Sequence, residues 1–289
     1  MKRIITSFCA VIMAVIMLGC ISRESYAAGT APVAKNLELK TYRNVSVGGM
    51  LSAFDADDDV TEYKITTFPV KGELTLNEDG SFIYTPAENK KGRDYFGYKV
   101  VDSEGNYSQE ATVIIKIEKQ NTAISYSDMK GRAEEYAAIV LAERDIFVGE
   151  KIGKDYCFFP DKEMSKAEFL AMSILVSGEP YISAVMNYNS ELPSWLACFA
   201  CSATVAGYES YDNWFETIDY NEAASMLNNI MNLTEISYMD IDAENELAQA
   251  CANLSACGIV DSSSMNCNNL SRAEAAQMLC KALALTENR

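Results

Sequence analysis

Four aspartates have a spacing that could bind a metal ion. Asp55, Asp57 and Asp59 alternate with other residues, and Asp102 follows an apolar stretch that ends at Val101. Calcium in proteins is held by about six to eight oxygen atoms, which clustered carboxylates can supply. We therefore expect a weak calcium site at these four aspartates. The alternative is a solvated acidic loop, because neither EF-hand spacing nor a bidentate glutamate accompanies the run.

Histidine is absent from the chain. This removes the commonest general base and the commonest metal-binding side chain, and it excludes Ser/His/Asp and Cys/His catalysis. Two carboxylates could still act as acid and base, but 41 acidic residues give no way to choose a pair. We therefore expect that the protein is not an enzyme.

Seven of the nine cysteines lie in the second half of the chain. Cys198 and Cys201 have redox spacing, but their segment is predicted to be the interior of a helix rather than a helix start after a strand. Zinc would need a second ligand pair. We interpret these cysteines as small buried apolar residues, with a thiol redox role as the alternative.

Residues 33–117 alternate apolar and polar positions in short segments, which is typical of β-strands. Asp79-Gly80 predicts a hairpin turn, because glycine accepts the positive φ that such a turn requires. Six or seven short strands predict an all-β, Ig-like two-sheet sandwich over residues 31–118. The expected strands are Asn36–Thr41, Tyr63–Phe68, Glu73–Leu76, Ser81–Thr85, Tyr95–Val101 and Thr112–Ile117, and the expected core is Leu74, Leu76, Phe82, Tyr84, Phe96, Tyr98 and Val100.

Five motifs follow one another within this segment, at 49–57, 71–74, 79–86, 92–100 and 102–105. With these motifs the segment resembles the bacterial cadherin-like, Ig-like repeat of surface proteins. The resemblance implies a spacer or adhesive module on the cell surface, and it also implies calcium binding. One copy is present, so we do not expect a long stalk.

Three signals for a helix start recur at Ser165, Asp219 and Ser271. Each lies three residues before a glutamate, which is the arrangement of a capping box. Apolar residues follow at helical spacing, and each capped helix is preceded by another helix and an irregular loop. A single two-helix unit cannot bury its apolar face, so we expect three units to pack together.

The first unit carries the motifs Tyr126-Ser127-Asp128, Ile146-Phe147-Val148-Gly149, Phe158-Phe159-Pro160-Asp161 and Ser165-Lys166-Ala167-Glu168. With them, the second part of the chain resembles the S-layer homology (SLH) domain. The repeats fall at about 126–177, 188–233 and 238–285, and the first is the clearest. The resemblance implies an all-α, pseudo-threefold domain over 126–289, whose grooves bind an anionic cell-wall polysaccharide.

The same resemblance implies polysaccharide contacts at five residues: Lys166, Arg272, Asp128, Asp240 and Trp195. A cation directly after the cap can meet a ligand carboxylate, and arginine can do so with two hydrogen bonds. The alternatives are a solvated lysine, caps on the first helices at Asp128 and Asp240, and a core anchor at Trp195. Fourteen acidic residues and no Lys or Arg lie between Lys166 and Arg272, so the second unit lacks the cation.

The first residues have the pattern of a signal peptide over residues 1–27. Lys2 and Arg3 precede an apolar run, and Ser25-Tyr26-Ala27 fits cleavage after Ala27, with a lipoprotein anchored at Cys20 as the alternative.

The formal net charge of −17 argues against nucleic acid and anionic membranes as partners. No later segment predicts a transmembrane helix. Residues 119–125 fit a linker.

We therefore expect a secreted bacterial protein of the cell surface. Its SLH-like half would bind cell-wall polysaccharide non-covalently, and its sandwich would be displayed, with other surface proteins as further partners. The alternative is a calcium-dependent adhesive or interaction module whose helical half is only structural.

Overall fold

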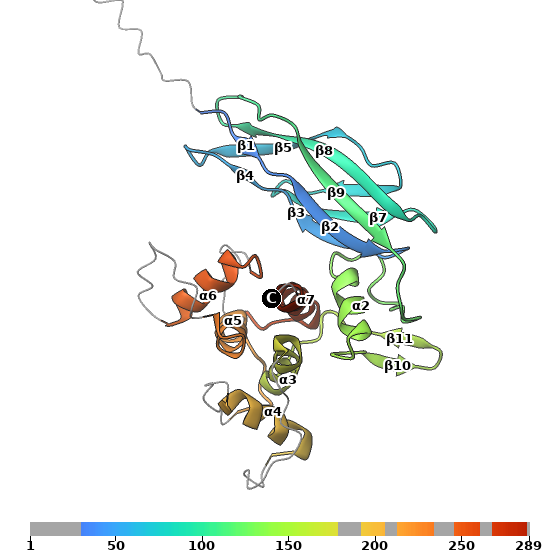
Figure 1. The fold of residues 1–289 in the computed structure, drawn as a ribbon, viewed down its shortest axis with the longest axis vertical. Helices are drawn as coiled ribbons and strands as arrows, with labels where there is room; N and C mark the ends of the chain where they lie inside the picture. Colours follow the sequence, from blue (N-terminus) through green and yellow to red (C-terminus); the bar gives the residue numbers. More distant parts are fainter. Residues whose placement is uncertain (1–29, 179–191, 206–212, 234–245, 261–267, 288–289) are drawn as a thin grey trace, which may run out of the picture.

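The computed structural model describes residues 30–178, 192–205, 213–233, 246–260 and 268–287. Within them, a β-sandwich lies against a group of helices (Figure 1). The predicted signal peptide and Asp240 lie outside the described residues. None of the described helices has both the length and the apolar composition needed to cross a membrane.

The first part of the chain is a sandwich of two main sheets, with strand orders β2-β9-β8-β5 and β3-β7-β6. The neighbouring strands are antiparallel except β2 and β9, which pair in parallel with Leu37 opposite Val113. The strands are β1 (Val33–Ala34), β2 (Leu37–Tyr42), β3 (Val47–Met50), β4 (Ala53–Phe54), β5 (Val60–Thr67), β6 (Gly72–Leu76), β7 (Ser81–Pro86), β8 (Gly92–Asp102) and β9 (Ala111–Glu118). The predicted β-sandwich is confirmed.

Alternate side chains of the facing sheets form the sandwich core. Phe82 and Phe96 meet edge to face, with ring centroids 5.2 Å apart, which is a favoured aromatic geometry. Tyr84, Tyr98 and Val100 are also buried, as predicted. The remaining predicted core residues, Leu74 and Leu76, are partly buried and pack against the same cluster.

The helical region has six helices among the described residues. In sequence order they fall into three units, and each unit has an outer helix followed by a capped helix. The units are α2 (Glu135–Glu143) and α3 (Lys166–Ser177), α4 (Ser194–Val205) and α5 (Tyr220–Ile230), and α6 (Glu246–Ala256) and α7 (Arg272–Glu287). A hairpin of β10 (Glu150–Ile152) and β11 (Asp155–Cys157) lies between α2 and α3.

The capped helices begin where the sequence predicts. Ser165 and Asp219 each form a complete capping box with the glutamate three residues later. At the third site, the amide of Ser271 donates to Glu274 Oε2 at 2.8 Å and the Glu274 amide donates back to Ser271 Oγ at 3.3 Å. All three predicted caps are confirmed.

A closed ring of backbone hydrogen bonds joins the residues just before the caps. The amide of Met164 donates to the carbonyl of Leu270 at 2.9 Å, that of Leu270 donates to Ile218 at 2.8 Å, and that of Ile218 donates to Met164 at 2.9 Å. All three side chains are buried in one hydrophobic cluster. The three units are therefore connected at their centre although their sequences are far apart.

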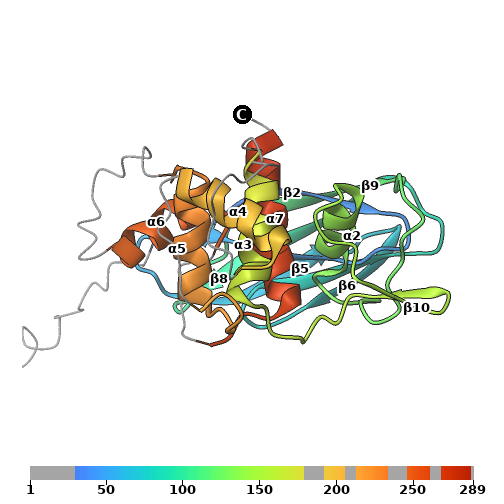
Figure 2. The ribbon, with the colours of Figure 1, turned by 90° about the horizontal axis from the view of Figure 1, so that it is seen from below.

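Each outer helix packs on the capped helix of a different unit. Helix α2 packs on α7, α4 on α3, and α6 on α5. Figures 1 and 2 show α3, α5 and α7 next to one another, with the outer helices around them. The three units therefore share one core, and none of them folds as a separate helical hairpin.

The sandwich is joined tightly to the first helical unit. The Ser46 amide donates to Glu135 Oε2 at 3.0 Å, and the Gly48 amide donates to the carbonyl of Ala133 at 2.9 Å. The Val45 side chain belongs to the hydrophobic core of the helical region. Burial raises the pKa of Glu135, although its amide hydrogen bonds favour the charged form.

The predicted linker at 119–125 contains no helix or strand, but it is held in place. One carboxylate oxygen of Glu143 accepts the amides of Asn121 at 2.5 Å and Thr122 at 3.1 Å, and the other accepts the hydroxyl of Tyr42 at 2.6 Å. The linker and the last residue of β2 are thus tied to the end of α2.

Candidate functional site

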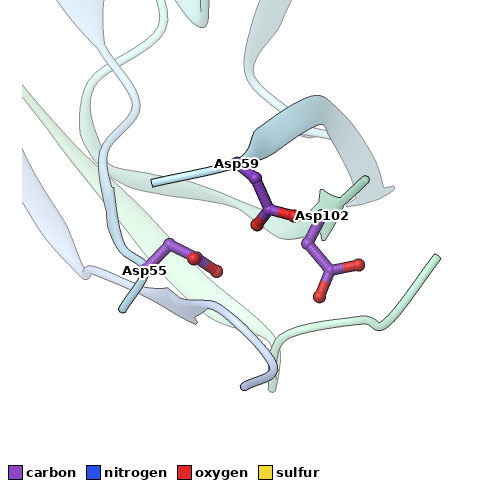
Figure 3. Close-up of side chains that lie close together, drawn as sticks. All are labelled: Asp55, Asp59 and Asp102. Carbon is purple, nitrogen blue, oxygen red and sulfur yellow. The ribbon is translucent and has the colours of Figure 1, made fainter. Parts of the chain in front are cut away.

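Three of the four aspartates predicted to bind calcium lie together at one end of the sandwich. Asp55 follows β4, Asp59 precedes β5, and Asp102 ends β8. One carboxylate oxygen from each lies within 4.8 Å of the other two (Figure 3). The fourth, Asp57, is not in this group; its Oδ2 accepts the amide of Thr30 at 3.1 Å.

The cluster is shaped by hydrogen bonds within its own loops. Asp102 accepts the amides of Glu104 at 3.0 Å and Asn106 at 2.7 Å. Partial loss of water raises the pKa of Asp102, but the Asn106 side chain and these amides together hold it below its usual value. Asp59 is bound by the hydroxyl of Ser103.

The donor set fits a hard divalent cation. Carboxylate oxygens are the ligands that calcium prefers, and the Asp55 Oδ2 atom is buried with no hydrogen-bond partner among the described residues. Three carboxylates supply fewer than the six to eight or so oxygens that calcium takes, so other ligands would complete the shell.

Lys166, a predicted polysaccharide contact, lies between two helical units. It is only 5% exposed, and its Nζ atom is 2.6 Å from Glu222 Oε1. Glu222 is the capping glutamate of the next unit. The alternative of an ordinary solvated lysine is wrong, because this side chain forms a largely buried ion pair across a unit boundary.

Arg272, a second predicted contact, has an equivalent position at the boundary between the third and first units. It is 2% exposed and donates from Nη1 to the carbonyl of Phe158 at 2.8 Å. Its guanidinium lies over the ring of Phe147, 4.8 Å from the centroid, and 3.8 Å from Glu168, the capping glutamate of the first unit. Among the described residues, its Nε atom is buried without a hydrogen bond. Arg272 thus contacts a carbonyl, an aromatic ring and a carboxylate of the first unit.

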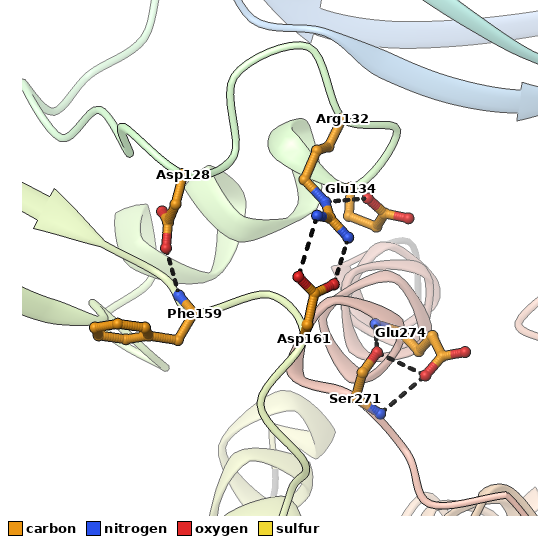
Figure 4. A network of polar contacts seen from close by, with 7 residues as sticks. All are labelled: Asp128, Arg132, Glu134, Phe159, Asp161, Ser271 and Glu274. Atoms are coloured by element: carbon orange, nitrogen blue, oxygen red, sulfur yellow. Dashed lines mark hydrogen bonds and ion pairs between the residues drawn. The ribbon is translucent and has the colours of Figure 1, made fainter.

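Asp128 holds the loop before α3. One carboxylate oxygen accepts the amide of Phe158 at 2.9 Å. The other accepts the amide of Phe159 at 2.8 Å (Figure 4). The alternative of a helix cap is wrong, because the N-cap of α2 is Glu134 and Asp128 bonds to a loop 30 residues away. Phe159 has a φ of 57°, so the clamp holds a left-handed backbone that a phenylalanine rarely adopts.

A groove of about 390 Å³ opens beside this loop. Arg132 crosses it to Asp161, with Nη2 2.8 Å from Oδ1, and also approaches Glu134 (Figure 4). Lys162 is exposed and forms no ion pair within the described part of the chain. The groove is lined by Asp128, Arg132, Cys157, Phe159, Pro160, Asp161 and Lys162. Of the predicted contacts, the groove includes Asp128, but neither Lys166 nor Arg272 lines it.

Trp195 is 46% exposed at the first turn of α4, so the alternative of a core anchor is wrong. The other tryptophan, Trp214, takes the core position and is 4% exposed.

The sequence offered no direct signal for Arg132 and Lys162, because the loop that brings them together is defined only by its contacts with Asp128.

A larger polar groove, about 650 Å³, lies at the junction between the sandwich and α2. It is lined by Tyr42, Glu118, Lys119, Asn121, Glu143 and Arg144. Glu143 is already bound by Tyr42 and the linker amides, and Arg144 pairs with Glu287 at 2.5 Å. We interpret this groove as part of the junction.

Burial raises the pKa of some of the described thiols. Six cysteines lie in the described residues, all as free thiols. Burial, with a smaller contribution from Cys198, raises the pKa of Cys201, and burial raises that of Cys280 to about 12. A raised pKa keeps a thiol protonated, whereas redox-active cysteines need a lowered one.

A family model described as the bacterial cadherin-like domain matches residues 29–119. Residues 29–119 form a bacterial cadherin-like domain. The match covers the sandwich and leaves the helical region outside it. The similarity of residues 126–285 to SLH repeats stays a prediction.

Solved structures similar to this chain include an adhesin and fibronectin(III)-like modules. The SrpA adhesin of Streptococcus sanguinis has 17% identity, with 41% of this chain and 78% of that chain covered and a TM-score of 0.28. The fibronectin(III)-like modules of Clostridium thermocellum CbhA have 15% identity, with coverages of 33% and 51% and a TM-score of 0.24. The chain spans 66%, 18% and 14% of the first three structures matched. No curated protein matches the sequence.

Proposed function

We propose that this is an exported, non-enzymatic bacterial surface protein in which a pseudo-threefold SLH-like domain attaches to cell-wall polysaccharide and carries the cadherin-like domain. The proposal depends on the hydrogen-bonded ring through Met164, Ile218 and Leu270. Three similar helix starts, each bonded to the next, are what a closed three-unit domain requires. The exchange of outer helices between units supports the same interpretation.

We place the polysaccharide contact at the groove beside the Asp128 clamp. Lys166 and Arg272 are buried against Glu222 and the Phe158 carbonyl, so their charges already have partners within the protein. Lys162 is exposed at the groove and lacks an ion pair among the described residues. An exposed cation beside a concave surface suits the carboxylate groups of an anionic glycan.

Retention on isolated cell-wall fragments tests this proposal. We expect the protein to be retained at moderate salt and Lys162→Glu to be released, because charge reversal repels an anionic glycan. Lys154→Glu is the matched control, since Lys154 is exposed in the β10–β11 hairpin and does not line the groove. Failure of the protein to be retained, while a functional SLH control is retained, would reject wall attachment.

A second candidate function is a calcium-dependent interaction module whose helical half is structural. The cluster of Asp55, Asp59 and Asp102 favours it, as does the buried, unpartnered oxygen of Asp55. Three carboxylates within 4.8 Å repel one another, and a divalent cation would remove that repulsion.

Thermal unfolding with calcium and with a chelator tests the second candidate. Calcium at a hundred times its Kd should stabilise the folded protein by about 2.7 kcal/mol. Asp59→Asn should abolish that gain, whereas Asp57→Asn should keep it, because Asp57 lies outside the cluster. Equal melting temperatures of the unmodified protein with and without calcium would exclude the site.

A further inference from the structure

The most exposed large apolar side chains of the described chain lie at the end of the cadherin-like domain opposite the aspartate cluster. Val70 is 80% exposed and Phe68 is 70% exposed, both in the loop between β5 and β6. Tyr95, near the start of β8, is 55% exposed. Exposed apolar groups that cluster on a soluble protein often mark an interaction surface.

A buried carboxylate holds the backbone of the β5–β6 loop. Asp94, 1% exposed, accepts the amides of Val70 at 3.1 Å and Lys71 at 2.7 Å. Asp94 immediately precedes Tyr95, so the β5–β6 loop is fixed next to the start of β8. The hydroxyl of Tyr84 also donates to Asp94, at 2.8 Å.

Basic residues surround the same place. The Lys71 Nζ atom donates to the carbonyls of Arg93 at 2.7 Å and Lys91 at 3.2 Å, which brings both segments together. Lys90, Lys91 and Arg93 are exposed, and none forms an ion pair with the described residues. We define the apolar–basic patch as Phe68, Val70, Lys71, Lys90, Lys91, Arg93 and Tyr95.

Phe68, Tyr95 and Arg93 are of residue types that protein interfaces favour. Aromatic and apolar side chains with arginine nearby are typical of the centre of an interface, and a loop already held in place loses little entropy on binding. The positive charge of the patch contrasts with the formal net charge of −17 of the whole chain. Complementarity therefore selects a partner that is acidic at this contact.

We infer that the apolar–basic patch binds an acidic polypeptide segment that carries apolar side chains between its carboxylates. Such a segment can cover Phe68 and Val70 while its carboxylates pair with Lys91 and Arg93. An anionic glycan would leave the aliphatic Val70 without a matching apolar group. An anionic membrane would repel the rest of this acidic chain.

This inference rests on the proposed role of the cadherin-like domain as the displayed module, but it does not depend on wall attachment or on calcium. The patch and the aspartate cluster lie at the two ends of β8, Gly92 and Asp102, and the proposed wall contact lies in the helical region, at the groove beside Asp128. A failure of wall retention would therefore leave the binding of a peptide at the patch unchanged. Likewise, a failure of peptide binding would leave wall retention unchanged.

Selection from a display library of random peptides on the full chain tests the inference. We expect enrichment of peptides that combine Asp or Glu with Phe, Leu or Ile, and the best of them should be measured as labelled synthetic peptides by fluorescence anisotropy. Lys91→Glu with Arg93→Glu should weaken binding by at least about tenfold and reduce its salt dependence. Phe68→Ser should weaken binding by a similar factor.

Matched variants on the β10–β11 hairpin serve as controls. Ile152→Ser removes an apolar side chain that is 55% exposed, and Lys154→Glu reverses an exposed charge, so both should leave the affinity unchanged. Three results would overturn the inference: no enriched acidic peptide, equal loss in the control variants, or tighter binding of polygalacturonate or phosphatidylglycerol vesicles through the same residues. Circular dichroism on every variant separates lost binding from lost folding.

Discussion

Replacement of Arg272 by alanine should destabilise the helical region severely. The guanidinium is 2% exposed and donates to the Phe158 carbonyl at 2.8 Å, and such a hydrogen bond from a charged group contributes about 1.5–3 kcal/mol. Its position over the Phe147 ring adds about 0.5–2 kcal/mol. These contributions overlap, since one side chain makes both contacts. We expect a total loss of no more than about 2–5 kcal/mol, the sum of the two contributions.

Urea unfolding followed by tryptophan fluorescence measures this loss directly, because Trp214 is buried in the helical core. Arg144→Ala is the matched control. Arg144 also forms an ion pair, with Glu287 at 2.5 Å, but its side chain is 53% exposed, so its removal should cost less than about 1 kcal/mol.

A loss below about 1 kcal/mol for Arg272→Ala would refute the reasoning, since the buried contacts would then contribute little. Unchanged stability together with lost retention on cell-wall fragments would instead identify Arg272 as a ligand contact. The two variants therefore separate a structural role from a binding role.

Three further predictions concern the junction and the caps. Burial raises the pKa of Glu135 in the folded protein. The contribution of the protonated Glu135 side chain to stability is therefore complete below the ordinary glutamate pKa of about 4.3, and it is lost as the pH rises through the raised pKa. Glu135→Gln should therefore gain stability relative to the unmodified protein as the pH rises above about 4. A difference in unfolding free energy that stays constant with pH would contradict this. Gly48→Ala would place a Cβ 2.6 Å from that of Ala133, so it should lower the free energy of unfolding by about 1–3 kcal/mol. It should also speed proteolysis within 119–125. An unchanged cleavage rate would show that the junction tolerates the methyl group. Asp219→Ala should cost about 1 kcal/mol in urea unfolding, and Asp219→Asn should cost much less, because asparagine also caps helices.

The local parts of the fold could be predicted from the sequence. A capping box is defined by two residues three positions apart, so Ser165 and Asp219 identify helix starts without knowledge of the rest of the chain. The alternation around Phe82 and Tyr84 likewise marks a strand with one buried face. The short strand β3 was missed, because Gly48 and Gly49 give it no alternation and its pairing depends on β7.

The surroundings of the predicted site residues could not be predicted. Lys166 and Glu222 are 56 residues apart, and Arg272 and the Phe158 carbonyl are 114 residues apart. The position of a cation after a helix cap says nothing about which loop covers it.

Asp57 lies outside the aspartate cluster for a different reason. An extended run would place Asp57 on the same face as its neighbours, but the chain turns there, with a φ of 55° at Asp58. Asp55 and Asp59 consequently meet each other and Asp102, while Asp57 turns to the Thr30 amide.

The hydrogen-bonded ring dictates an order of events during biosynthesis. Every strand of the cadherin-like domain is present once Glu118 has emerged, so this domain can collapse early. The helical region must wait, because without Leu270 the Met164 amide has no acceptor and the Ile218 carbonyl has no donor. A nascent chain that stops before Leu270 would keep both polar groups and their apolar neighbours in water, and we expect quality-control proteases to degrade it.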